Sequence, residues 1–190
     1  DSARGVNTLA SRFLAELPNA SYIDVFTPML DGEGRPRADL YGPDALRCYV
    51  LREVSSGSDG EVSPEGFETR YTTELANEYG NLASRTISMI AKYREGVVPE
   101  ARDETTLDRA GLEAIEAYGK AMDRLDLRGG AEAAWDLVAT ANLYIQQVAP
   151  WKLAKEGREA ELDTALAALA RALHRLAVLS GPFIPGKATD

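Results

Sequence analysis

Apolar side chains between Ser63 and Arg94 recur every three to five residues, which predicts one long amphipathic helix. Ser63 can cap the start of this helix, and Pro64 suits the first helical position. Gly96 then ends it. The helix therefore has an apolar face that needs packing partners. The residues of that face are Phe67, Tyr71, Leu75, Tyr79, Leu82, Ile87, Ile90 and Tyr93.

Polar side chains occupy the opposite side of the same helix at the same spacing. Asn81 and Arg85 are one turn apart and point the same way. Both make two-point hydrogen bonds, which suits reading the edges of nucleic-acid bases. A solvent-facing polar pair, or a cap for a neighbouring loop, is the ordinary explanation of such spacing. The polar face as a whole contains Glu74, Asn77, Asn81, Arg85, Ser88 and Lys92.

The chain from residue 41 to residue 190 has the helical pattern almost throughout, so we expect an all-α helical bundle of five or so helices there. A Gly-Gly pair at 129–130 is expected to close one of these helices, and Pro150 to break another. The further helices are expected at residues 43–54, 107–125, 134–148 and 162–179.

The pattern of residues 1–40 differs from that of the rest of the chain and predicts a small α/β N-terminal appendage. A short helix is expected at 7–17, a strand at 21–26 and a loop rich in Gly and Pro at 27–40. One strand cannot make a sheet alone, so this segment is expected to dock on the bundle, pair with another chain or stay partly disordered.

The composition of the chain limits the classes of function that it can have. The net charge of −9 argues against a protein that binds nucleic acid through a broad basic surface, but it leaves room for a local site that stacks on and hydrogen-bonds a loop of RNA. No apolar run is long enough to span a bilayer and no leader pattern opens the chain, so we expect a cytoplasmic protein without membrane contact.

Reactive side chains are sparse. Cys48 and His174 are the only residues of their kinds, which excludes an internal disulfide and a Cys- or His-based metal site. No Gly-rich phosphate loop or nucleophile–base pair stands out. We therefore expect no cofactor, no metal and no catalysis from this chain alone.

Trp151 is the other candidate binding residue. It follows Pro150 directly, so it lies at a helix junction. Its ring could stack on an extruded base or cap the core of the bundle, and composition alone favours the core. If it binds RNA, we expect it to converge with Asn81 and Arg85 on one unstacked nucleotide.

Several stretches resemble the C-terminal part of the methionyl-tRNA synthetase family, a class I family. They are YGPDALRCYVLREV at 41–54, GSDG at 57–60, ELANEYGNLASR at 74–85 and NLYIQQVAPWK at 142–152. The resemblance covers about residues 40–185 and implies an anticodon-binding helical domain. It matches Asn81 and Arg85 to the family's anticodon-contacting residues and Trp151 to its base-stacking tryptophan. The implied partner is the CAU anticodon loop of methionine tRNA.

Departures from that family limit what the resemblance implies. The nucleotide-binding fold and its two signature motifs have no counterpart here, so activation of methionine by ATP is not expected. About residues 7–40 instead resemble a C-terminal segment of SGNH (GDSL-type) hydrolases, in which an Asp-x-x-His pair follows. Here Asp44 is followed by Arg47 in place of the histidine. The chain therefore looks like a chimera of the two.

Three alternatives stay open from the sequence. The bundle could be a structural or interaction protein without RNA binding, associating with itself or with a partner. It could be an esterase remnant, although Arg47 cannot serve as the base that a serine needs. It could also be a piece of a longer ligase with a separate catalytic domain, against which the unusual residues 1–40 argue.

Overall fold

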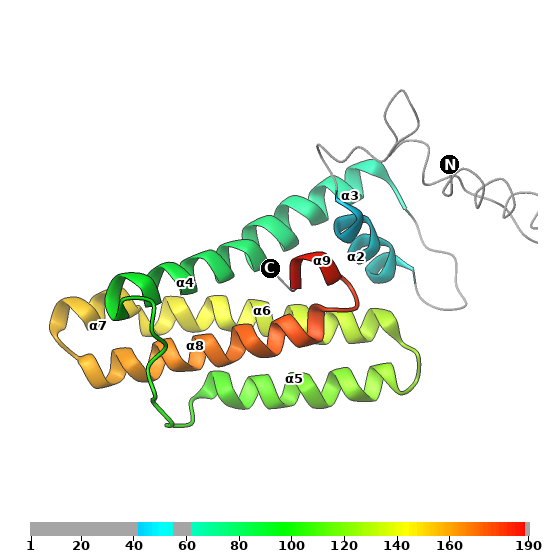
Figure 1. Ribbon diagram of the computed structural model, residues 1–190. Coiled ribbons are helices and arrows are strands. Elements are labelled where there is room, and N and C mark those ends of the chain that lie inside the picture. The colour runs from blue at the N-terminus through cyan, green and yellow to red at the C-terminus, as the bar shows by residue number, and fades with distance from the viewer. Residues whose placement is uncertain (1–41, 55–61, 189–190) are drawn as a thin grey trace, which may run out of the picture. The chain divides into compact units, whose positions relative to one another are not determined.

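The computed structural model describes residues 42–54 and 62–188 (Figure 1). The described residues from Pro43 onward belong to one compact unit. All regular elements among them are helices, so the expected all-α bundle is confirmed. The predicted appendage, with its helix, strand and loop, lies outside the described residues, as does the GSDG stretch.

The described helices are, in chain order, α2 (Pro43–Glu53), α3 (Pro64–Arg70), η2 (Tyr71–Gly80), α4 (Asn81–Arg94), α5 (Thr106–Met122), α6 (Leu127–Val148), α7 (Pro150–Glu156), α8 (Glu159–Ser180) and α9 (Pro185–Ala188). Helices α3, η2 and α4 follow one another without a break and form the long rod that the sequence predicts. This rod crosses α6 and α8, and α5 packs on the other side of that pair (Figure 1).

The start of the rod follows the predicted capping pattern. The Ser63 hydroxyl accepts a hydrogen bond from the Gly66 amide at 3.0 Å, and a proline occupies the first turn. The middle of the rod differs from the prediction, because Tyr71–Gly80 is a π-helix with no buried residue. A Cβ at Gly80 would lie 3.1 Å from the Leu75 carbonyl oxygen, so glycine suits the last turn of this segment.

Two residues of the predicted apolar face, Tyr71 and Ile87, are exposed, and Ile87 departs most from the prediction. Ile87 is 62% exposed, whereas its neighbour Thr86 is fully buried. The buried positions of α4 are Leu82, Thr86 and Ile90, which are four residues apart. Adjacent residues of an α-helix are about 100° apart around its axis, so a face that contains position 86 turns position 87 towards solvent.

The predicted helix end at the Gly-Gly pair is also wrong. Helix α5 ends at Met122, and both glycines lie in the first turn of α6. The Asp126 carboxylate caps α6 by accepting from the Gly129 amide at 2.9 Å. A Cβ on the buried Gly130 would lie 2.8 Å from the Met122 sulfur, so the glycine permits close approach of α5 and α6.

Helices α5, α6 and α8 enclose the main core, whose buried residues are largely alanine and leucine. Small side chains let the three helices pack closely, and Leu137, Ile145 and Leu176 fill the space between them. A smaller cluster of Ile90, Leu153, Leu162 and Leu166 joins α4 to α7 and α8. This second cluster holds the end of the rod against the short helix that contains Trp151.

A buried carboxylate ties the loop before α5 to α8. Asp108 closes a capping box with Thr105 and accepts two hydrogen bonds of 2.7 Å from the Arg171 guanidinium. Arg175 donates to the same carboxylate at 3.2 Å, and Arg171 also donates to the Ala101 carbonyl at 2.8 Å. These bonds lower the pKa of Asp108 well below its ordinary range, with the Arg171 hydrogen bond as the main cause.

Candidate nucleic-acid interface

Trp151 lies where α6 gives way to α7. Ala149 adopts the left-handed conformation at φ 47°, and Pro150 begins α7, so the chain turns sharply just before the indole. Trp151 is 43% exposed. The ring is therefore open to solvent and is not enclosed in the core, the role that composition alone favours.

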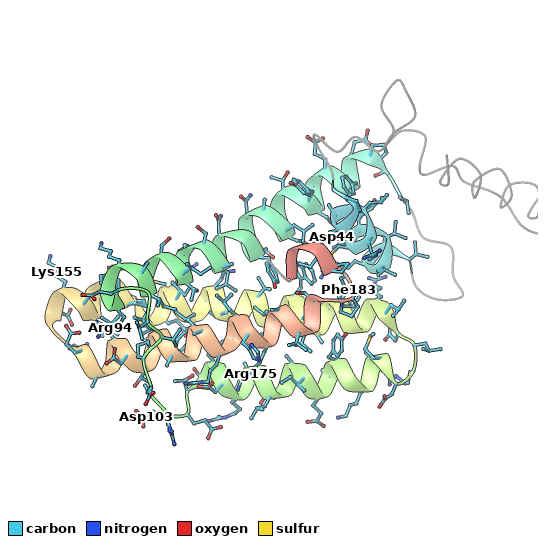
Figure 2. All side chains as sticks on the ribbon, in the orientation of Figure 1. Asp44, Arg94, Asp103, Lys155, Arg175 and Phe183 are labelled. Carbon is cyan, nitrogen blue, oxygen red and sulfur yellow. The ribbon has the colours of Figure 1, made fainter. Side chains whose placement is uncertain are left out.

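The indole borders an open hollow of about 440 Å³ between α4, α7 and the start of α8. Figure 2 shows Arg94 and Lys155 at this end of the bundle, where the last turn of α4 meets α7. The hollow is lined by Lys92, Tyr93, Arg94, Trp151, Ala154, Lys155, Glu159 and Leu162.

The charges around this hollow favour an anion. Glu159 is its one carboxylate, and Arg94 pairs with it at 2.6 Å. Arg94 also donates to Asp163 at 2.5 Å, a hydrogen bond that raises the pKa of the guanidinium. Within the described part of the chain, Lys92 and Lys155 have no ion-pair partner. The hollow is thus locally cationic on a chain whose net charge is −9.

Asn81 and Arg85 lie on α4, and both are exposed. Neither lines the hollow beside Trp151. Their side chains have no hydrogen bond or ion pair with any residue that the structure describes, so their donors and acceptors are available. The structure keeps these two residues together on one face of α4, as the spacing predicts, and neither is among the residues that line the hollow with Trp151.

A polar stripe connects the two places. Asn81, Arg85, Ser88 and Lys92 follow one another at spacings of four, three and four residues, which puts them on one face of α4. All are exposed, and Lys92 reaches the hollow beside Trp151. With a rise of about 1.5 Å per residue, the stripe is about 16 Å long. Sequence reasoning identified its residues but not its end point, because only the fold shows that α7 meets this end of α4.

Side chains from other helices hold the rod next to this stripe. The Asn142 amide of α6 donates to the Glu78 carbonyl at 3.2 Å, three residues before Asn81. The Tyr79 hydroxyl lies 3.0 Å from that of Ser180 on α8, and burial raises the Tyr79 pKa. Contacts with α6 and with α8 therefore fix the turn that precedes Asn81, the first residue of α4.

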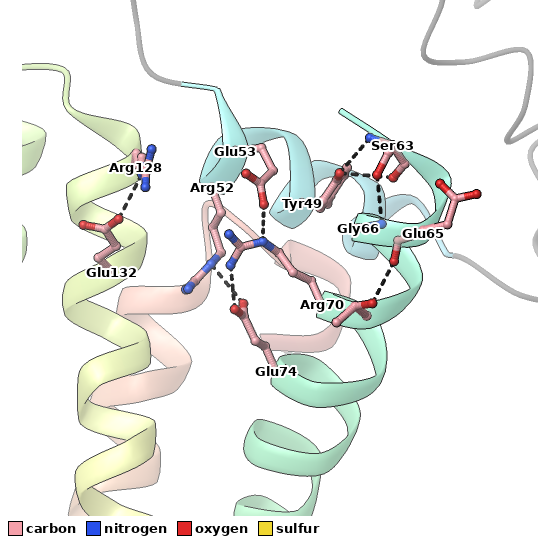
Figure 3. Close-up of polar contacts among 11 residues, drawn as sticks. Tyr49, Arg52, Glu53, Ser63, Glu65, Gly66, Arg70, Glu74, Arg128 and Glu132 are labelled. Atoms are coloured by element: carbon pink, nitrogen blue, oxygen red, sulfur yellow. Dashed lines mark hydrogen bonds and ion pairs between the residues drawn. The ribbon is translucent and has the colours of Figure 1, made fainter. Parts of the chain in front are cut away.

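Helix α2 is fixed to the rod by a network of charged side chains (Figure 3). Glu74 lies 3.0 Å from Arg52 and 2.6 Å from Arg70, and Arg70 also pairs with Glu53. The Arg52 guanidinium lies 4.7 Å from the centre of the Trp135 ring. Glu74, which the spacing puts on the polar side of the long helix, therefore faces α2 and is not open to solvent.

Side chains that suggest catalysis do not gather in the described residues. Cys48 is buried in α2, and burial raises the pKa of its thiol to about 12, so it stays protonated. His174 is exposed on α8. Within residues 42–54 and 62–188, no group of acidic, histidine or cysteine side chains has the arrangement of a metal site, and no helix is both long and apolar enough to cross a lipid bilayer.

Comparison with known families decides what kind of domain this is. Residues 95–190 match a family described as the anticodon binding domain of methionyl tRNA ligase. The chain belongs to this family. Residues 34–87 match a second family, the class I tRNA synthetases (M). The resemblance inferred from the sequence motifs is thereby confirmed, and nothing in the comparisons favours an interaction bundle without RNA binding.

Curated relatives of this methionyl-tRNA synthetase domain have the same name in several bacteria. The chain is 42% identical over 152 residues to the methionine–tRNA ligase of Oceanobacillus iheyensis, covering 77% of this chain and 23% of the relative. It is also 42% identical over 153 residues to that of Streptomyces coelicolor, covering 76% of this chain and 28% of the relative. The chain thus spans about a quarter of the length of these ligases.

Solved structures agree with the sequence comparisons. The Mycobacterium tuberculosis methionyl-tRNA synthetase in complex with methionyl-adenylate matches with a TM-score of 0.73 at 35% identity, over 80% of this chain and 31% of that one. The free form of the same enzyme gives the same TM-score and identity. The described bundle is therefore the anticodon-binding domain of a methionyl-tRNA synthetase in fold as well as in sequence.

The suggested resemblance of residues 7–40 to SGNH hydrolases has no support in these comparisons, and neither does a chimeric origin. The class I synthetase match begins at residue 34, inside the stretch assigned to the hydrolase. Short Gly- and Asp-containing stretches of this kind occur in many loops, so they are weak evidence for a family.

Proposed function

We propose that this chain binds the anticodon loop of methionine tRNA and serves as the tRNA-recognising part of a methionine–tRNA ligase. The observation that carries the proposal is the exposed indole of Trp151 beside a cationic hollow, at the end of a stripe that begins with Asn81. The match covers only 23% of the Oceanobacillus iheyensis ligase, so we assign the activation of methionine to residues outside this chain.

The stripe and the hollow have separate roles in this proposal. An unstacked base lies on Trp151, because aromatic stacking on a base contributes roughly 1–3 kcal/mol. Asn81 and Arg85 hydrogen-bond the edges of other bases farther along α4, since the stripe of about 16 Å is too long for one nucleotide. The three residues thus contact successive nucleotides of one loop, in place of the single nucleotide expected from the sequence.

The charge of the chain limits its attraction to RNA to the neighbourhood of the hollow. The chain has a net charge of −9, so long-range attraction to RNA is weak and phosphate contacts come from Lys92 and Lys155 beside the hollow. We therefore expect modest affinity for an isolated anticodon loop, with a shallow dependence on salt concentration.

Binding to a labelled anticodon stem-loop tests this proposal. Fluorescence anisotropy compares a stem-loop that contains CAU with one of the same length in which the three anticodon bases are changed. We expect saturable binding of the CAU loop and binding at least about tenfold weaker for the altered loop, the difference of about one lost base contact. Equal binding of the two loops contradicts the proposed function.

A further inference from the structure

Tyr93 lies in the hollow beside Trp151, and the proposed function gives it no role. It is half-buried on the last turn of α4 and packs against the small apolar cluster that includes Ile90, Leu153 and Leu162. The Lys92 ammonium lies 5.2 Å from the centre of its ring. Packing on one side and a cation near the ring keep Tyr93 in place at the wall of the hollow.

The Tyr93 hydroxyl is available for a ligand. Among the residues that the structure describes, no side chain or carbonyl hydrogen-bonds to it. A phenol both donates and accepts, so it can pair with a base edge, a ribose hydroxyl or a phosphate oxygen. Tyr93 and Trp151 come from different helices, α4 and α7, and both line the same hollow.

We propose that Tyr93 is a second aromatic contact for the nucleotide that stacks on Trp151, and that it positions this nucleotide in the hollow. The inference rests on the proposed function. A base that stacks on the exposed indole meets the anchored tyrosine at the neighbouring wall, where aromatic groups prefer offset or edge-to-face contacts. The phenol then holds the nucleotide by a hydrogen bond that it can donate or accept, whereas the indole can only donate.

The lining of the hollow favours a nucleotide over other ligands. Two aromatic rings provide flat apolar surface, and two lysines without ion-pair partners among the described residues provide attraction for a phosphate. Glu159, the carboxylate at the wall, is already paired with Arg94. A single-stranded nucleic acid combines a flat base with an anionic backbone, which is the combination that such surfaces bind.

Abasic RNA provides the test. Three CAU stem-loops each lack one anticodon base, and their affinities for wild type, Trp151→Leu and Tyr93→Leu are measured by anisotropy. We expect each variant to bind the intact loop about fivefold or more weakly than wild type. For one of the three abasic loops, the same one for both variants, we expect both to bind with wild-type affinity, because the base that Trp151 and Tyr93 contact is missing there.

A purely structural role of Tyr93 gives a different pattern. The inference is overturned if Tyr93→Leu weakens the binding of all four loops equally. It is also overturned if the abasic loop on which Tyr93→Leu has no effect differs from the one on which Trp151→Leu has no effect. If wild type itself does not distinguish CAU from an altered anticodon, the proposed function fails first. Tyr93→Phe removes only the hydroxyl in the hollow. Tyr118→Phe on α5 is its control, because it removes a hydroxyl outside the hollow.

Fluorine NMR of the wild-type sequence labelled with 3-fluorotyrosine provides a second test that requires no destabilising change. The spectrum of Tyr93→Phe identifies the Tyr93 signal. We expect this signal to shift when the CAU loop is added and to stay in place with the abasic loop on which Trp151→Leu has no effect. A Tyr93 signal that does not respond to the bound CAU loop overturns the inference.

Discussion

Thr86 shows how a single residue departs from the pattern around it. It is fully buried in α4, and its hydroxyl has no hydrogen-bond partner among the described residues. A buried hydroxyl without a partner costs roughly 1–3 kcal/mol in proteins. The apolar positions on either side predicted a core face here, but nothing in the sequence marked a threonine as part of it.

Replacement of Thr86 by valine is therefore expected to stabilise the bundle. The change keeps the shape of the side chain and removes the unpaired hydroxyl, so we expect the free energy of unfolding to rise by about 1 kcal/mol. Urea denaturation followed by circular dichroism measures this change. The same substitution at the exposed Thr72 is the control, and a loss of stability in Thr86→Val contradicts the assignment.

Asp108 makes stability depend on pH. The arginine hydrogen bonds lower its pKa in the folded state, so the carboxylate stabilises the fold above its unfolded pKa, near 3.8. That contribution is lost as the pH falls from about 4 through the lower folded pKa. We expect Asp108→Asn to be less stable than wild type at pH 7 by about 2 kcal/mol, the scale of a hydrogen bond to a charged group.

Thermal unfolding of wild type and Asp108→Asn at pH 7 and pH 3 checks this expectation. The gap in melting temperature between the two proteins should narrow at pH 3, because protonation has begun to weaken the wild-type contact. Asp123→Asn, an exposed position at the end of α5, should follow wild type at both pH values. A gap that widens at pH 3 contradicts the role assigned to Asp108.

Trp151 is the residue with the largest expected effect on RNA binding. Trp151→Ala removes the stacking surface, and we expect affinity for the CAU stem-loop to fall by about tenfold or more. The side chain is 43% exposed, so the effect on stability should be small. Val178→Ala, at a 65% exposed position on α8, is the control in the same anisotropy measurement.

At the scale of helices, local chemistry predicted most of the boundaries. Ser63 and Pro64 begin the rod, and Pro150 separates α6 from α7, because capping and the missing proline amide act within a turn. The Gly-Gly pair misled the prediction. Glycine permits both a helix end and a close helix contact, and only the packing of α5 on α6 shows that Gly130 serves the second purpose.

The polar stripe on α4 makes a prediction for salt dependence. If Lys92 contacts a phosphate, Lys92→Gln should lower the slope of log Kd against log salt concentration by about 0.7, the value for one contact with a single strand. Lys120→Gln on α5 makes the same change of charge outside the hollow and should leave the slope close to that of wild type. Equal slopes for wild type and Lys92→Gln contradict a phosphate contact at the end of the stripe.

At the scale of the whole molecule, the sequence pointed to the residues of the proposed site but not to their arrangement. Helical spacing put Asn81 and Arg85 on one face, and the proline break set Trp151 apart, because both are local effects. The meeting of α4 with α7 depends on the buried cluster around Leu153 and Leu162, which spacing within one helix cannot show. The hollow with its two lysines therefore became visible only in the fold.

The effect of the net charge on binding also depends on how the charged residues are arranged. A net charge of −9 suggests poor nucleic-acid binding, yet the ion pairs of Arg94 neutralise the carboxylates near the hollow and leave its lysines to act on a ligand. The average charge of a chain thus says little about one small site.

Tryptophan fluorescence during titration with the CAU stem-loop tests the central claim most directly. Trp135 is 4% exposed and Trp151 is 43% exposed, so a base that stacks in the hollow quenches mainly the second indole. We predict saturable quenching by the CAU loop, no comparable quenching by the altered loop, and loss of the signal in Trp151→Phe. Binding of the CAU loop without quenching of Trp151 would contradict the account.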